Sequence, residues 1–256
     1  MQLASLMHGE PTDRPPLVIA HGLFGSGRNW GAIARRLSAG RQVVAVDMRN
    51  HGDSPRSAKQ GYAAMAGDLA ETIAGLGGRA DLLGHSMGGK AAMVLALTEP
   101  ARVRRLVVAD MAPTAYGHSQ IGYVRAMQAV ELDGIRRRSD ADASLARSVA
   151  DAGLRAFFLQ SLAVGPEGAA WKLNLPVLDA EMPVIMAFPA SDGRFDGPAL
   201  FLTGARSDYV RPEHWPEIRR LFPDARHVEI PAAGHWLHAE APDAFAASVA
   251  DFLDAR

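Results

Sequence analysis

The chain has 256 residues, enough for one large hydrophobic core or for a core domain that carries an insertion. Hydrophobic residues make up 48% and charged residues 21%, a composition that excludes an intrinsically disordered chain. Lys and Arg number 27 against 28 Asp and Glu, so no basic excess indicates nucleic acid, and the lack of cysteine excludes disulfides, thiolate catalysis and cysteine-bound metal.

The N-terminal segment shows neither a basic start nor a sustained apolar run, so we predict no signal peptide. No stretch approaches the roughly 18 apolar residues that a membrane helix needs. We therefore expect a soluble, cytoplasmic protein whose partner is a small molecule, and neither nucleic acid nor a membrane. The oligomeric state does not follow from the sequence.

Short runs rich in Val, Ile and Leu predict buried strands in the first half of the chain. The buried strands are expected at residues 17–20, 42–46, 80–83 and 106–109, after a first strand at residues 3–7. Helical patterns lie between them, at residues 30–37, 62–76 and 90–98. Because strand alternates with helix, we predict parallel pairing in a doubly wound α/β sheet.

This alternation stops in the middle of the chain. Between about residues 113 and 188 the pattern is helical, with candidate helices at 121–132, 145–162 and 168–173. Strands return at 199–203 and 227–230, followed by a last amphipathic helix at 242–254. We predict one α/β core domain, residues 1–112 and 190–256, with residues 113–189 inserted as a helical cap.

The strongest chemical signal is the segment Gly84-His85-Ser86-Met87-Gly88, which matches G-x-S-x-G between a predicted strand and a predicted helix. So sharp a turn strains the backbone at the serine, and side chains two positions to either side would collide with the neighbouring strand and helix. Glycines at 84 and 88 remove that collision. We predict that Ser86 is the nucleophile of a serine hydrolase and that the N–H group of Met87 stabilises an oxyanion.

A serine hydroxyl needs a base to take its proton. Among nine histidines, His235 follows the last predicted strand and precedes the last helix, which places it at the same sheet edge as Ser86. We predict His235 as the general base. The glycine-containing segment His21-Gly22-Leu23 follows an earlier strand, and we expect its Leu23 N–H group to be the second oxyanion donor, with His21 in a structural role.

The acid that orients the histidine has two candidates. Asp110 and Asp208 each follow a predicted strand, and the residues alone do not separate them.

Four segments taken together resemble the α/β-hydrolase superfamily across nearly the whole chain outside the cap. They are His21-Gly22-x-x-Gly25, Asp47-x-Arg49-x-His51-Gly52-x-Ser54, Gly84-His85-Ser86-Met87-Gly88-Gly89 and Gly234-His235. Finer details are similar to the small intracellular esterases of the YbfF type, namely Asp47-Met48-Arg49-Asn50-His51-Gly52, Met87-Gly88-Gly89-Lys90 and Phe222-Pro223. The resemblance implies an α/β-hydrolase fold, a short helical cap and hydrolysis of small acyl esters or acyl thioesters.

The resemblance also bears on the acid. Most relatives place the aspartate three residues after the glycine that ends the later strand, where this chain has Ser207. The esterase branch typically uses the aspartate that ends the strand after the nucleophile helix, so it favours Asp110. Asp47 and Arg49 are expected to tie loops together as scaffold residues.

We therefore expect a serine esterase that acts through an acyl-enzyme on Ser86. Two alternatives share the same pocket: another reaction of the triad, such as C–C bond hydrolysis or perhydrolysis, and a small-ligand receptor that turns over slowly. No cofactor is predicted, because Ala91 stands where a phosphate loop needs Ser or Thr. No metal is predicted either, because the histidines show no metal-binding spacing.

Overall fold

The computed structural model describes residues 1–255, and its centre is a seven-stranded sheet in the order β1-β3-β2-β4-β5-β8-β9. Strand β1 runs antiparallel to β3, and every other neighbouring pair is parallel. The predicted doubly wound, mostly parallel sheet is thereby confirmed. The strands are β1 (Ser5–His8), β2 (Leu17–Ala20), β3 (Val43–Val46), β4 (Ala80–His85), β5 (Val103–Ala109), β8 (Ala199–Gly204) and β9 (Ala225–Ile230).

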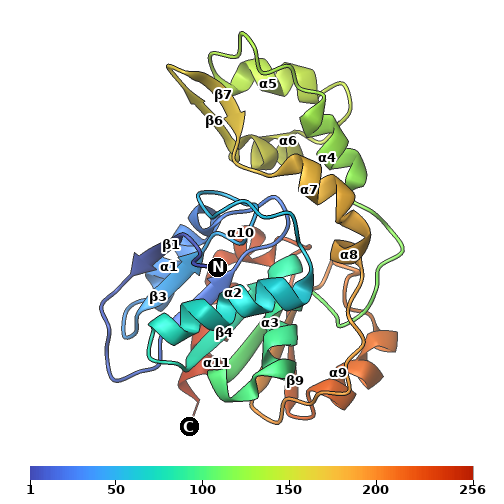
Figure 1. Cartoon of the computed structure of the whole chain (residues 1–256). Coiled ribbons are helices and arrows are strands. Elements are labelled where there is room, and N and C mark those ends of the chain that lie inside the picture. Colours follow the sequence, from blue (N-terminus) through green and yellow to red (C-terminus); the bar gives the residue numbers. More distant parts are fainter. Residues whose placement is uncertain (256) are drawn as a thin grey trace.

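Helices cover both faces of the sheet, as its continuous apolar strands require. Side chains alternate between faces along β2, so Leu17 and Ile19 pack with α1 and α11 while Val18 packs with α2 and α3. Helices α2 and α3 lie side by side (Figure 1). The core helices are α1 (Gly31–Leu37), α2 (Tyr62–Gly75), α3 (Met87–Thr98), α9 (Trp215–Leu221), α10 (Leu237–Glu240) and α11 (Pro242–Asp254), with 3₁₀ turns η1 (Gly27–Trp30), η2 (Pro100–Arg102) and η3 (Pro212–His214).

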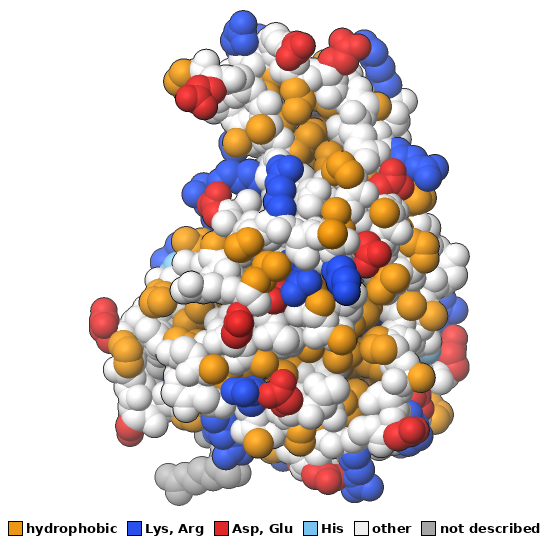
Figure 2. Space-filling model, in the orientation of Figure 1, with side chains coloured by type: hydrophobic (Ala, Val, Ile, Leu, Met, Phe, Trp, Pro, Cys, Tyr) orange, Lys and Arg blue, Asp and Glu red, His pale blue; other side chains and the backbone are white. Residues whose placement is uncertain are grey.

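The segment between β5 and β8 forms a separate, narrower lobe that stands on the core (Figures 1 and 2). On the face shown in Figure 2, Lys and Arg side chains lie among Asp and Glu side chains on both lobes. The division at residues 113 and 189 stays a prediction. This upper lobe, called the cap below, contains α4 (Ile121–Gln128), α5 (Arg138–Leu145), α6 (Ala152–Leu159), β6 (Leu162–Gly165), β7 (Gly168–Trp171), α7 (Leu175–Ala180) and α8 (Met182–Met186).

The cap is not wholly helical, and the predicted helix at 168–173 is wrong. Strands β6 and β7 pair there as an antiparallel hairpin. Its turn is Pro166-Glu167, and Gly168 follows with φ +114°, a conformation that favours glycine. The helix predicted at 145–162 is also too long, since α6 covers only Ala152–Leu159. Within residues 1–255, no helix has the length and apolar character needed to cross a bilayer.

Candidate active site

Ser86 occupies the sharp turn between β4 and α3 with φ +52° and ψ −119°, a strained conformation for a residue with a side chain. The flanking glycines are required by close backbone contacts. A Cβ atom on Gly84 would lie 2.3 Å from the Gly88 carbonyl oxygen, and one on Gly88 would lie 2.3 Å from the Ala20 carbonyl oxygen. The turn therefore exposes the serine hydroxyl at the carboxyl edge of the sheet.

His235 lies in the loop between β9 and α10, and its Nδ1 atom is 2.7 Å from Oδ2 of Asp110. The Asp110 side chain is fully buried at the end of β5. The Gly204 N–H group donates to its Oδ1 at 3.2 Å, and the Ser207 hydroxyl donates to Oδ2. A carboxylate surrounded by donors keeps the proton on Nδ1 of His235, so Nε2 is left as an acceptor.

Asp208 lies on the surface, and within residues 1–255 its carboxylate has no hydrogen-bond partner. Its carbonyl oxygen accepts a hydrogen bond from Arg211 at 3.1 Å. Of the two acids that the sequence left open, the structure brings only Asp110 to the His235 imidazole.

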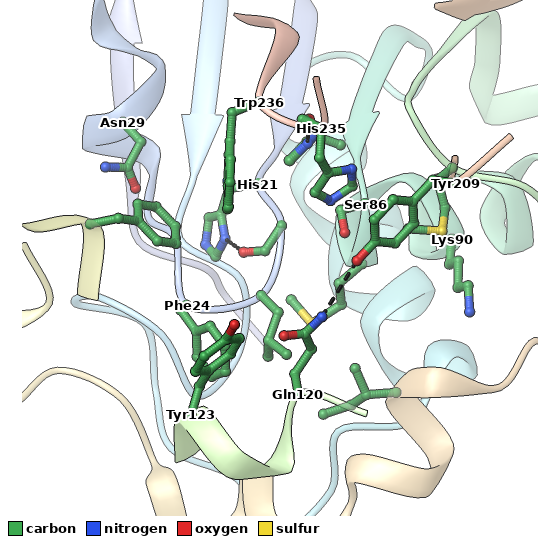
Figure 3. Close-up of a pocket in the computed structure, with 18 of the residues that line it drawn as sticks. His21, Phe24, Asn29, Ser86, Lys90, Gln120, Tyr123, Tyr209, His235 and Trp236 are labelled. Atoms are coloured by element: carbon green, nitrogen blue, oxygen red, sulfur yellow. Dashed lines mark hydrogen bonds between the residues drawn. The ribbon is translucent and has the colours of Figure 1, made fainter. Parts of the chain in front are cut away.

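Ser86 and His235 line one cavity, and Figure 3 shows the imidazole beside the serine. Within the described residues no hydrogen bond joins Oγ of Ser86 to the imidazole. Such contacts commonly tighten when substrate binds.

The loop of residues 21–25 crosses close to Ser86, because a Cβ atom on Gly22 would lie 3.1 Å from the Ser86 Cβ. His21 braces this loop: its Nδ1–H group donates to the Gly22 carbonyl at 2.7 Å, and its Nε2 accepts the Met48 N–H at 2.9 Å. Burial lowers the pKa of His21 to about 4, so the ring stays neutral and able to accept at neutral pH. His21 thus has the structural role expected from the sequence.

Both polar backbone groups of Phe24 form hydrogen bonds. The residue adopts φ +67°, its N–H group donates to Nε2 of His51 at 3.3 Å, and its carbonyl oxygen accepts from the cap residue Ser161 at 3.0 Å. The N–H groups of Leu23 and Met87, in contrast, have no acceptor within residues 1–255. Both residues line the cavity beside Ser86, so two unpaired donors are available to an oxyanion there.

The scaffold residues named from the sequence tie the surrounding loops together. The Asp47 carboxylate accepts the N–H groups of Gly27 and Asp53, each at 2.7 Å. Arg49 forms a two-pronged ion pair with Asp68 at 2.6 and 2.8 Å. Asn50 has φ +64°, the left-handed geometry that asparagine tolerates.

His238 is the histidine nearest to His235 in the sequence. It lies in α10, buried, with its ring stacked on Trp30 at a centroid distance of 4.1 Å. Burial lowers its pKa to about 3, so it carries no charge at neutral pH. Within residues 1–255, no cluster of His, Asp and Glu side chains suits a metal ion.

The cavity has a volume of about 300 Å³, and its wall is mostly apolar. Core and cap each supply part of the wall (Figure 3). Asn29 of the core binds Gln160 of the cap at 2.5 Å across one side of the cavity. The apolar lining includes Phe24, Tyr123, Leu154, Phe157, Phe158, Ile185 and Met186.

Lys90 is a buried lysine in the cavity wall, and no sequence pattern indicates its place there. Its side chain extends from α3, and its ammonium donates to the carbonyl oxygens of Met186 at 2.9 Å and Ala187 at 2.7 Å. It also lies 4.7 Å from the centre of the Tyr116 ring. Burial lowers the pKa of Lys90 to about 7. Its two hydrogen bonds hold residues 186–187, where the chain returns from the cap, against α3.

Lys90→Met is expected to remove a pH dependence from the stability of the fold. The folded pKa of Lys90, about 7, lies below its ordinary value of 10.5, so unfolding takes up a proton between these values and the free energy of unfolding rises with pH. One such group gives at most about 1.4 kcal/mol per pH unit. Urea unfolding at several pH values within that window measures the slope.

The exposed Lys59 provides the matched control, because Lys59→Met should keep the wild-type slope. Parallel stability curves for the wild type and Lys90→Met would show that burial does not depress the pKa of Lys90.

Comparison with known proteins settles the family. The sequence profile described as "Alpha/beta hydrolase family" matches residues 17–248, a stretch that contains Ser86, Asp110 and His235. The chain belongs to the alpha/beta hydrolase family. The superfamily resemblance drawn from the motifs is thereby confirmed.

Individual relatives in this family are esterases and lipases. The chain is 43% identical to the sn-1-specific diacylglycerol lipase ABHD11 of Mus musculus over 97% of its own length and 84% of the relative's. It is 39% identical to esterase YbfF of Escherichia coli over 93% of each chain. A solved marine microorganism esterase superposes with a TM-score of 0.93 at 36% identity, covering 98% of this chain and 99% of the other. The predictions of a hydrolytic enzyme and of esterase activity are confirmed.

Proposed function

We propose that the chain hydrolyses small acyl esters through an acyl-enzyme formed on Ser86. The observation that carries this proposal is the 2.7 Å contact between His235 and the buried Asp110, next to a serine on a strained turn. That contact leaves Nε2 of His235 free to accept a proton, which is what the serine hydroxyl requires of a base.

In the first half of the reaction Oγ of Ser86 attacks the ester carbonyl carbon while Nε2 of His235 takes the hydroxyl proton. The carbonyl oxygen becomes an oxyanion, which the N–H groups of Leu23 and Met87 stabilise. Collapse of this intermediate breaks the bond to the alcohol, and His235 gives the alcohol its proton. Asp110 holds the imidazole in the required tautomer and stabilises the imidazolium.

The second half repeats these steps with water. His235 takes a proton from the water as its oxygen attacks the acyl carbon, and the same two N–H groups hold the new oxyanion. Collapse breaks the bond to Ser86 Oγ, which recovers its proton from His235, and the carboxylic acid leaves. In this mechanism Ser86, His235 and Asp110 act through their side chains. Leu23 and Met87 act through their backbone N–H groups.

The size of the cavity supports a small acyl group. Its volume of about 300 Å³ stands at the low end of the range for ligand sites, about 300–1,000 Å³. Aromatic side chains of the cap, among them Phe157 and Phe158, bound it, so a long acyl chain would have to displace them. The mouse relative is named for diacylglycerol, whereas the cavity here favours short chains.

A series of p-nitrophenyl esters tests this substrate class. We expect kcat/KM to be highest for acetate to hexanoate and to fall by roughly tenfold or more for laurate, because the cavity does not admit the added methylenes. Acyl thioesters of the same lengths form the second arm of the assay. Equal kcat/KM for butyrate and laurate would contradict the assignment of a small acyl pocket.

A further inference from the structure

Tyr209 stacks on the imidazole of His235. The ring centroids are 3.9 Å apart and the ring planes are inclined by 15°, so the phenol covers one face of the imidazole. The ring of His85 lies at 4.7 Å from His235 and that of Trp236 at 5.9 Å. Figure 3 shows Tyr209 beside His235 and Ser86.

The phenol hydroxyl of Tyr209 reaches the cap. It accepts a hydrogen bond from the amide of Gln120 at 3.4 Å, drawn as a dashed line in Figure 3, and it hydrogen-bonds with His118 at 3.1 Å. Both partners lie just before α4, where the chain enters the cap. The Tyr209 side chain therefore contacts the cap through its hydroxyl and the proposed base, His235, through its ring.

The backbone of Tyr209 is tied to the acid. Its N–H group donates to Oγ of Ser207 at 3.4 Å, and that hydroxyl donates to the Asp110 carboxylate. Its carbonyl oxygen accepts from the Tyr116 hydroxyl at 2.8 Å, and the same hydroxyl accepts the Ala112 N–H at 3.0 Å. The first link ends on the Asp110 carboxylate, and the second ends on Ala112, two residues after Asp110.

The His235 ring needs a constraint beyond its contact with Asp110. The Cβ atom and the hydrogen bond at Nδ1 hold one edge of the ring, but they leave the ring able to tilt and to move Nε2 relative to Ser86. A stacked aromatic ring opposes this motion, because parallel rings lose contact when one of them tilts. Tyr209 supplies that ring.

We propose that Tyr209 is a positioning residue for His235 and that its hydroxyl couples the position of the imidazole to the seating of the cap. The proposal rests on the function proposed above, since it deepens the role of His235 in that site. The hydrogen bonds from Gln120 and His118 would then hold the phenol against the imidazole and add a smaller contribution to kcat than the ring itself.

Two variants of Tyr209 separate the ring from the hydroxyl. Tyr209→Leu removes the stack, and we expect kcat on p-nitrophenyl butyrate to fall about tenfold with a smaller change in KM, the effect of losing a good aromatic pair. Tyr209→Phe keeps the stack and should restore kcat to within about threefold of the wild type. The exposed neighbour Asp208 supplies the control, Asp208→Asn, which should leave both constants unchanged.

A spectroscopic signature reports on the imidazole without turnover. The proton that His235 and Asp110 share should give a ¹H resonance far downfield of the amide region in the wild type, Tyr209→Phe and Asp208→Asn. In Tyr209→Leu we expect that resonance to broaden or vanish through exchange with water. A sharp, unshifted resonance in Tyr209→Leu, or a loss confined to KM, would overturn the positioning role.

The link to the cap is tested by a double-mutant cycle between Gln120→Leu and Tyr209→Phe, scored on kcat. We expect Gln120→Leu to lower kcat in the wild type and to have little effect once the hydroxyl is gone. Additive effects would overturn the link, and the cycle remains informative if Tyr209→Leu does not fold. Full activity of Ser86→Ala would instead overturn the proposed function, a failure distinct from any change in the resonance.

Discussion

Ser86→Ala is expected to lower kcat for p-nitrophenyl butyrate on the order of 10⁶-fold, the cost of removing the nucleophile from a serine triad. The fold should persist, because alanine is smaller than serine and bears the same strain at φ +52°. Steady-state kinetics with circular dichroism melting measures both quantities.

The matched control for this variant is Ser139→Ala, which changes an exposed serine in the cap helix α5 and should leave kcat unchanged. Loss of a serine nucleophile lowers kcat far more than tenfold. If Ser86→Ala kept more than about a tenth of the wild-type kcat, Ser86 would not be the nucleophile.

Asp110→Asn is expected to lower kcat about 10⁴-fold, as the same exchange does in another serine triad. The Gly204 N–H group requires an acceptor at the position of Oδ1, so the amide oxygen of the asparagine takes that place. The NH₂ group then faces Nδ1 of His235, which must accept instead of donate. The proton moves to Nε2, and the imidazole no longer accepts the proton of Ser86.

Asp208→Asn is the companion variant. Because the Asp208 carboxylate is exposed and unpaired within residues 1–255, its loss should leave kcat close to the wild-type value. A severe loss of kcat in Asp208→Asn, together with an active Asp110→Asn, would assign the acid to Asp208 and contradict the contact between Asp110 and His235.

Much of the site follows from local sequence because local geometry creates it. The turn at Ser86 needs glycines at 84 and 88, since any side chain would collide with backbone there, and that demand is visible as a motif. The central strands of the sheet, β2, β3, β4, β5 and β8, are equally visible, because burial on both faces requires mostly apolar runs. The last helix, for example, matches its predicted bounds, residues 242–254.

The sequence leaves the choice between Asp110 and Asp208 open for a physical reason. Asp110 and Asp208 follow β5 and β8, which pair in parallel, so both strands end at the same edge of the sheet. Sequence alone does not reveal which side chain is buried at that edge. The structure shows Asp110 fully buried between the donors of Gly204 and Ser207 and leaves Asp208 on the surface.

The cap and the residues that join it to the site were harder to predict. The hairpin β6–β7 is only half-buried, so it lacks the continuous apolar runs that mark the core strands. Tyr209 and Lys90 act through contacts with cap residues far away in sequence, such as Gln120 and Met186. No local pattern records such contacts.

Covalent labelling identifies the nucleophile without turnover of a substrate. The wild-type enzyme is treated with a fluorophosphonate, digested and mapped by mass spectrometry, in parallel with Ser86→Ala and Ser139→Ala. We predict one phosphonyl group per chain on Ser86 in the wild type and in Ser139→Ala, and none in Ser86→Ala. An adduct on another residue, or labelling that survives in Ser86→Ala, would contradict an acyl-enzyme on Ser86.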